Sequence, residues 1–143
     1  MKTLRYNPPS EWTGDSSNHL FLGFCDMLSY VNSYFKSRND LKMIEIGSYM
    51  GESSSLFASS GMFKEIHCIE PFHQNEDAND DLGYTWDDKK KEFETNTRMF
   101  DNIILHEDFS FNVEHKFKDG TFDFVYVDGE HDYESVERDI KLY

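Results

Sequence analysis

Apolar residues follow two different spacings along this chain, and the change of spacing predicts alternating helices and strands. Between residues 20 and 35 they recur every three or four positions, which predicts an amphipathic helix that begins near Asn18. Four short apolar runs come later, and each has the length and the flanking turn residues of a buried strand. The predicted strands are residues 41–46, 65–70, 103–105 and 122–127.

The segments between and after these strands carry helical features. In the charged segment after residue 86, Phe93, Met99 and Phe100 are expected to face the core, whereas Lys89-Lys90-Lys91 is expected to form a solvated face. The last helix has Asp132 at a favourable N-cap position. The predicted helices are residues 52–60, 87–100, 111–117 and the segment that follows Asp132, and residues 73–88 are predicted to be a polar, acidic loop.

Strands that alternate with helices predict an α/β fold with a parallel sheet and right-handed crossovers. We therefore expect a Rossmann-like sheet of about four strands with flanking helices. The length of 143 residues fits one domain. Residues 1–17 contain Pro8-Pro9 and Gly14, so we expect an irregular N-terminal segment followed by a single domain over residues 18–143.

Composition and charge narrow the classes of partner. The formal net charge is −14, and an acidic surface repels phosphate backbones and anionic lipid, so neither nucleic acid nor a membrane is an expected partner. No apolar stretch is long enough to span a bilayer, and the first residues lack the apolar core of a signal peptide. Cys25 and Cys68 lie in apolar contexts, which predicts reduced thiols in a cytoplasmic protein.

The turn after the first predicted strand is the strongest local signal for a ligand. Gly47 ends the apolar run and Gly51 opens a Ser-rich helical start, so backbone N–H groups would face a ligand above the strand. Glu70 lies where dinucleotide folds place an acidic ribose ligand, about 20 residues further on. Glu45, just before the turn, adds a second carboxylate. Tyr49 occupies the place of the second glycine in the nicotinamide pattern, which disfavours a nicotinamide-binding Rossmann domain.

A glycine or an acidic residue ends each of the four predicted strands. Because parallel strands present their carboxyl ends at one edge, these residues are expected to meet there, where ligands of such sheets bind. The four residues are Gly47, Glu70, Asp108 and Asp128.

Two stretches resemble a known family. They read EIGSYMGES over residues 45–53 and VDGEHDYESV over residues 127–136, and the following helix carries Asp139. They resemble the class I S-adenosylmethionine methyltransferases, and look closest to the small-molecule O-methyltransferases of the macrocin O-methyltransferase type. The resemblance covers residues 41–143. It implies S-adenosylmethionine as the cofactor and a hydroxyl of a small molecule, such as a sugar, as the acceptor.

The resemblance also implies roles for matching positions. The turn Gly47–Gly51, which includes Tyr49, would hold the methionine moiety, with Ser48 and Ser53 near its carboxylate. Glu70 would bind the ribose hydroxyls. Asp108 would lie beside the adenine.

The second stretch suggests the chemistry. Asp128 would sit beside the transferred methyl group, and in metal-dependent members this position is a Mg²⁺ ligand. His131 is either a base or ligand, or else a polar residue at the rim, and Asp132 serves as the helix cap. The family's sheet has seven strands, whereas four are predicted here, so we expect a truncated methyltransferase fold without the C-terminal strands.

Two functions remain open on the sequence. One is a methyltransferase; the other is a non-catalytic, cofactor-binding half-domain, or truncated paralogue, that assembles with itself or with a partner. In either case the fourth strand would be an apolar edge, and a homo-oligomer that covers it is expected.

Overall fold

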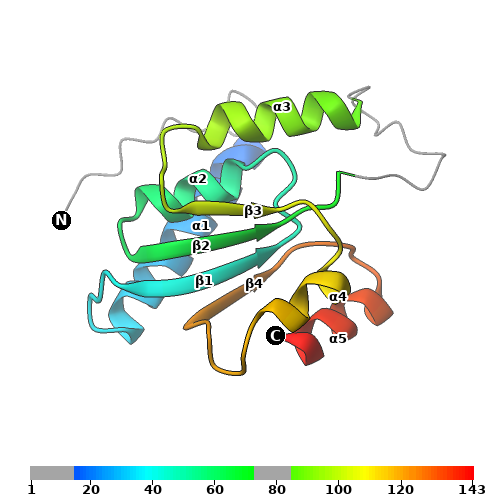
Figure 1. Ribbon diagram of the computed structural model, residues 1–143. Coiled ribbons are helices and arrows are strands. Elements are labelled where there is room, and N and C mark those ends of the chain that lie inside the picture. The colour runs from blue at the N-terminus through cyan, green and yellow to red at the C-terminus, as the bar shows by residue number, and fades with distance from the viewer. Residues whose placement is uncertain (1–14, 73–84) are drawn as a thin grey trace.

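A computed structural model describes residues 15–72 and 85–143 of the chain. Helices and strands alternate along these residues, as Figure 1 shows. In chain order they are α1 (Asp15–Tyr34), β1 (Leu41–Ile46), α2 (Glu52–Ser59), β2 (Phe63–Ile69), α3 (Trp86–Thr97), β3 (Ile103–His106), α4 (Ser110–Val113), the 3-10 helix η2 (Glu114–Lys116), β4 (Phe124–Val127) and α5 (Tyr133–Leu142).

The four strands form one parallel sheet in the order β3-β2-β1-β4. β1 pairs with β2 along its whole length, and the register ends with Ile46 opposite Ile69. On its other side β1 pairs with β4, so that Ile46 also lies opposite Val127. All four strands therefore present their carboxyl ends at one edge of the sheet. The predicted Rossmann-like α/β sheet with flanking helices is confirmed.

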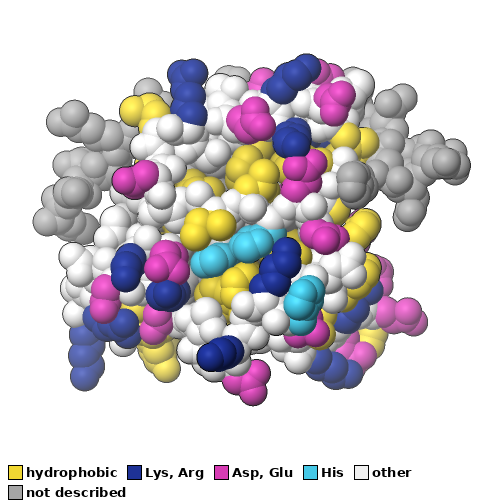
Figure 2. Space-filling model, viewed as in Figure 1, with side chains coloured by type: hydrophobic (Ala, Val, Ile, Leu, Met, Phe, Trp, Pro, Cys, Tyr) yellow, Lys and Arg dark blue, Asp and Glu magenta, His cyan; other side chains and the backbone are white. Residues whose placement is uncertain are grey.

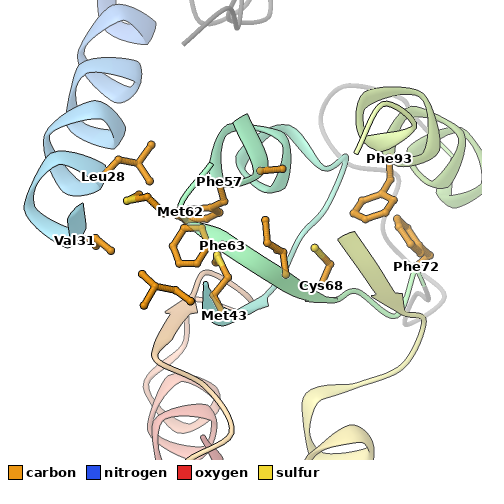
Figure 3. Close-up of a cluster of buried hydrophobic side chains, with 12 residues drawn as sticks. Leu28, Val31, Met43, Phe57, Met62, Phe63, Cys68, Phe72 and Phe93 are labelled. Atoms are coloured by element: carbon orange, nitrogen blue, oxygen red, sulfur yellow. The ribbon is translucent and has the colours of Figure 1, made fainter. Parts of the chain in front are cut away.

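The larger core lies between the sheet and the helices α1, α2 and α3 (Figure 3). Its centre is Phe57 of α2, which is fully buried and makes edge-to-face contacts with Phe63 and Tyr126. Such aromatic pairs stabilise a core beyond the area they bury. The side chains labelled in Figure 3 are Leu28, Val31, Met43, Phe57, Met62, Phe63, Cys68, Phe72 and Phe93.

A smaller core lies on the opposite face, under α4 and the C-terminal end of α5. Ile44, Ile46 and Ile69 pack there with Val113 of α4, and Tyr143 covers them. Successive residues of a strand point to opposite faces. Four of the six β1 residues are apolar, because the side chains of this strand enter two cores in turn.

Two predictions about the third helix are wrong. α3 begins at Trp86, with Thr85 and Asp88 in a reciprocal capping box, so the last residues of the predicted 73–88 loop are helical. Residues 73–84 lie outside the described part of the chain. Phe93 is buried as expected, but Met99 is 84% exposed because the helix ends at Thr97 and the chain turns away before Met99.

Other boundaries differ by a few residues. α1 begins at Asp15 rather than near Asn18, and β2 begins at Phe63. The division into an irregular segment over residues 1–17 and a domain over residues 18–143 stays a prediction. Among the described strands, none pairs with the outer edge of β4. Within residues 15–72 and 85–143, no helix combines the length and the apolar character that a bilayer crossing requires.

Candidate functional site

A cavity of about 480 Å³ opens at the carboxyl edge of the sheet. Its wall combines the β1–α2 turn, the residues after β2, the first turn of α3, the loop after β3 and the segment from Asp128 to Asp139. Of the residues predicted for the site, those that line the cavity are Gly47, Ser48, Tyr49, Ser53, Glu70, Asp128 and His131. Glu45, Gly51 and Asp108 are not part of its lining.

The two glycines of the β1–α2 turn are required by the backbone. Gly47 has a φ of 84°, and a Cβ atom there would lie 2.2 Å from the carbonyl oxygen of Asp128. Gly51 has a φ of 77° and is the N-cap of α2, where a Cβ would lie 2.9 Å from side-chain atoms of Phe93 and Thr97. Gly47 thus lets the β4–α5 loop approach the turn, and Gly51 lets α3 approach it.

Ser48 offers an unused hydroxyl beside the cavity. Its side chain is buried, and although Oγ lies near the Glu45 carboxylate, it has no hydrogen-bond partner of good geometry in the described part of the chain. Leaving such a group unpaired costs about 1–3 kcal/mol. Close by, α2 begins at Glu52, and the first N–H groups of a helix have no partner within the helix. Together they form a place for a carboxylate or another acceptor.

Glu45 supports the turn from beneath. It is fully buried, and its two carboxylate oxygens accept hydrogen bonds from the hydroxyls of Ser53, at 2.5 Å, and Ser54. Burial raises the pKa of Glu45, while these hydroxyls act in the opposite direction. Since the carboxylate faces protein on all sides, its contribution to the site is to position the start of α2.

Glu70 follows β2 and is a buried carboxylate of the cavity wall. Oε2 accepts a hydrogen bond from the backbone N–H of Tyr49 at 2.8 Å, and Oε1 accepts one from Phe72 at 3.2 Å. Burial raises the pKa of Glu70, and the two backbone bonds oppose this effect. A carboxylate has about four acceptor positions, so Glu70 can still accept hydrogen bonds from hydroxyl groups.

Asp108 turns away from the cavity. Its Oδ1 accepts hydrogen bonds from the backbone N–H of Phe109 and from the side-chain amide of Asn112, both at 2.8 Å. These bonds hold the start of α4. The cavity wall at this point comes instead from the next two residues, Phe109 and Ser110.

Asp128 follows β4, and its backbone packs against Gly47 of the β1–α2 turn. Its backbone N–H bonds to the carbonyl of Ile46 at 2.8 Å, which anchors it to β1. The Asp128 carboxylate lies 3.5 Å from Nε2 of His131 and accepts a hydrogen bond from the Tyr126 hydroxyl at 3.4 Å. Burial raises the pKa of Tyr126, with the charge of Asp128 as a second cause, so the phenol remains a hydrogen-bond donor. Asp132 caps α5 by accepting a bond from Ser135, as predicted.

The residues of this cluster do not fit the expected Mg²⁺ site. Within residues 15–72 and 85–143, no three His, Cys, Asp or Glu side chains are grouped so that they could hold a metal ion. Asp128 and His131 are together, but a magnesium ion needs several oxygen ligands in near-octahedral geometry.

The structure adds residues that the sequence did not assign to the site. Trp86, at the start of α3, lines the cavity, as do Phe109 and Arg138. Asp139 lines it too and is buried, with a hydrogen bond from Ser110 Oγ at 2.6 Å. The sequence signal that could have indicated Arg138 and Asp139 was an arginine next to an acidic residue on the inner face of an amphipathic helix. The charged residues of the lining are mostly acidic, which favours a ligand that carries positive charge; they are Glu52, Glu70, Asp128, Glu130 and Asp139, against the single Arg138.

The fold and the cavity define a Rossmann-like α/β domain with a ligand site at the carboxyl edge of its parallel sheet. A model of the methyltransferase-domain family matches residues 44–143, and the chain belongs to this family. The family and the fold together identify a methyltransferase domain built on a Rossmann-like parallel sheet.

One solved structure with the same fold is the crystal structure of a fibrillarin/Nop5p complex, with a TM-score of 0.52 and 14% sequence identity. The alignment covers 74% of this chain and 46% of the solved chain, so this chain spans about half the length of that neighbour. No curated protein matches the sequence.

Proposed function

We propose that this domain binds S-adenosylmethionine and transfers its methyl group to a hydroxyl of a small molecule, such as a sugar, as macrocin O-methyltransferase-like proteins do. One observation carries the proposal. The backbone of Asp128 and Gly129 packs against Gly47, so that the Asp128 carboxylate and His131 lie beside the turn assigned to the cofactor. A general base and a cofactor-binding turn thus share one cavity.

The cavity fits the cofactor on two grounds. The unpaired Ser48 hydroxyl and the N–H groups at the start of α2 suit the methionine carboxylate, and Glu70 suits the ribose hydroxyls. The acidic lining suits a ligand whose sulfur carries a positive charge. S-adenosylmethionine, when bound, supplies an activated methyl group. In this assignment Glu45 acts through Ser53 and Ser54, and Asp108 acts through the loop that it holds.

The residues after β4 would then act on the acceptor. The Asp128 carboxylate, or His131 beside it, accepts the proton of the acceptor hydroxyl as the oxygen attacks. Tyr126 donates to Oδ2 of Asp128, and Nε2 of His131 lies 3.5 Å from Oδ1, so the carboxylate and the imidazole form one proton-accepting pair. Most of the rate enhancement would come from alignment of the two reactants in the cavity. Since no metal site is present in the described residues, no step is assigned to Mg²⁺.

Product formation from labelled S-adenosylmethionine over a panel of hydroxylated small molecules tests the proposal. Asp128→Asn should abolish transfer while leaving folding and cofactor affinity unchanged. Asp101→Asn, an exposed aspartate in the turn before β3, is the matched control and should retain full activity. Transfer that continues unchanged in Asp128→Asn would remove this carboxylate from the mechanism. Addition of EDTA and of Mg²⁺ in parallel assays tests the metal-dependent version directly.

The alternative is a non-catalytic half-domain that binds the cofactor and assembles with itself or a partner. It is favoured by the outer edge of β4, which has no partner among the described strands. The fibrillarin neighbour was crystallised with a protein partner, Nop5p. Tight cofactor binding without transfer to any acceptor would favour this alternative.

Assembly and location complete the proposal. We expect a homo-oligomer that covers the β4 edge, and light scattering that shows a monomer at micromolar concentration would contradict it.

Nucleic acid is not among the proposed acceptors, because the net charge is −14 and, on the face seen in Figure 2, Lys and Arg side chains are interspersed with Asp and Glu. Both cysteines are free thiols, which fits a reducing cytoplasm.

A further inference from the structure

Lys89 is a buried cation at the wall of the cavity. It was expected to lie on the solvated face of α3 with Lys90 and Lys91, but only 1% of its surface is exposed. Its Nζ lies 3.5 Å from the centroid of the Trp86 ring and 5.1 Å from that of the Tyr49 ring. Burial of an ammonium group is costly, and contact with the faces of two aromatic rings offsets part of that cost.

The two rings belong to different segments of the cavity wall. Trp86 lies in the first turn of α3, whereas Tyr49 lies in the β1–α2 turn. Tyr49 has a φ of 44°, which a non-glycine residue rarely adopts. Its backbone N–H bonds to Glu70, and its ring faces Lys89. Lys89 therefore connects α3 to the turn that is assigned to the cofactor.

We propose that Lys89 is a positioning residue for the cofactor: it holds Tyr49 and Trp86 at the cavity wall and supplies positive charge to the side of the cavity where Glu70 lies. This inference rests on the proposed function, because it assigns Glu70 to the ribose hydroxyls. It adds a residue that does not itself line the cavity and that acts through its neighbours.

The charges around Glu70 support this role. Burial raises the pKa of Glu70, and the Glu130 carboxylate adds to this effect from the β4–α5 loop. The backbone N–H groups of Tyr49 and Phe72 and the charge of Lys89 act in the opposite direction. Without the lysine, the pKa of Glu70 rises further. Glu70 would then lose its charge at a higher pH, and a neutral carboxyl is a poorer acceptor for two ribose hydroxyls.

Lys89→Met tests the inference, because methionine keeps much of the apolar length and removes the charge. We expect the affinity for S-adenosylhomocysteine, measured by calorimetry, to fall about tenfold near pH 6 and by less at pH 8. Lys89→Arg keeps a cation that stacks on aromatic rings and should restore most of the affinity. Lys91→Met removes the same charge from an exposed position of α3 and should leave the affinity unchanged.

A second readout needs no ligand. Carbon-13 NMR of the labelled Glu carboxyl groups, with the Glu70 signal assigned through Glu70→Gln, reports the titration of Glu70 in the ligand-free protein. Its midpoint should move to a higher pH in Lys89→Met and return in Lys89→Arg. An unchanged midpoint, or an affinity loss that is equal at all pH values, would overturn the electrostatic role of Lys89. A wild-type protein that does not bind S-adenosylhomocysteine, while the Glu70 midpoint still shifts, would contradict the proposed function instead.

Discussion

Replacement of Gly47 by alanine should destabilise the protein strongly, because Gly47 combines a left-handed backbone with a close contact. The φ of 84° costs a non-glycine residue about 1–2 kcal/mol. The added Cβ would also lie 2.2 Å from the carbonyl oxygen of Asp128, far inside the 3.0 Å that real Cβ atoms respect. The β4–α5 loop must then move and strain the 2.8 Å bond from Asp128 N to Ile46 O, which costs about 1–3 kcal/mol more if it breaks.

The expected loss is therefore about 2–5 kcal/mol in the free energy of unfolding. Urea denaturation followed by circular dichroism measures it directly. Gly61→Ala is the matched control, since Gly61 has a φ of 69° but no atom within 4 Å of the added Cβ. It should lose only the conformational part, about 1–2 kcal/mol.

A second control measures the effect of replacing a glycine by alanine where the backbone is not strained. Gly23 is exposed within α1, and nothing lies within 4 Å of its added Cβ. Gly23→Ala should stabilise the protein by about 0.5–1 kcal/mol, because alanine favours a helix. If Gly47→Ala costs no more than Gly61→Ala, the contact between the β1–α2 turn and the β4–α5 loop does not constrain the protein, and the reasoning fails.

Three further predictions concern buried titratable groups. Glu70→Ala should weaken S-adenosylhomocysteine binding by about 1.5–3 kcal/mol, the scale of hydrogen bonds to a charged group, and an unchanged dissociation constant in calorimetry would remove Glu70 from the ribose site. Glu45 has a raised pKa, so the free energy of unfolding of the wild type decreases as the pH rises through that pKa. Glu45→Gln should therefore gain stability relative to wild type between pH 5 and pH 8. In urea denaturation, a difference in free energy of unfolding between variant and wild type that stays constant over this range would argue against this. His67 and His106 share a 2.8 Å hydrogen bond, and burial lowers both pKa values, that of His106 to about 4. Stability should therefore fall as the pH decreases from 6.5 toward 4, and His106→Gln should reduce this acid-side loss, whereas an identical pH dependence in the variant would contradict the assignment.

Much of the fold could be predicted because its signals are local. The span of β1 is as predicted, since a short, mostly apolar run bounded by a glycine has few other solutions in an α/β pattern. The N-cap of α5 at Asp132 is also as predicted, because a cap depends on hydrogen bonds within one turn. The predicted start of α3 was one residue too late. Thr85 and Asp88 form a capping box there, but they lie in a segment that was assigned to a loop because of its acidic composition.

The candidate site was predicted in part. Strand ends and parallel topology were enough to bring Gly47, Glu70 and Asp128 to one cavity. Asp108 also follows a strand, but it does not line the cavity. Its carboxylate instead accepts hydrogen bonds from a nearby backbone N–H and a side-chain amide at the start of α4. Lys89 was misjudged, since a run of three lysines carries no mark of which one faces two aromatic rings.

The amino-acid sequence by itself determined the order of helices and strands, the glycine turn and the edge of the sheet at which polar residues gather. These follow from spacing and backbone preference, which act over a few neighbouring residues. Only the tertiary structure decided that Glu45 supports the turn from beneath, that Ser48 keeps an unpaired hydroxyl and that Lys89 is buried. Burial and pairing depend on side chains brought together from distant segments, and their energies arise only when the sheet and its helices are packed.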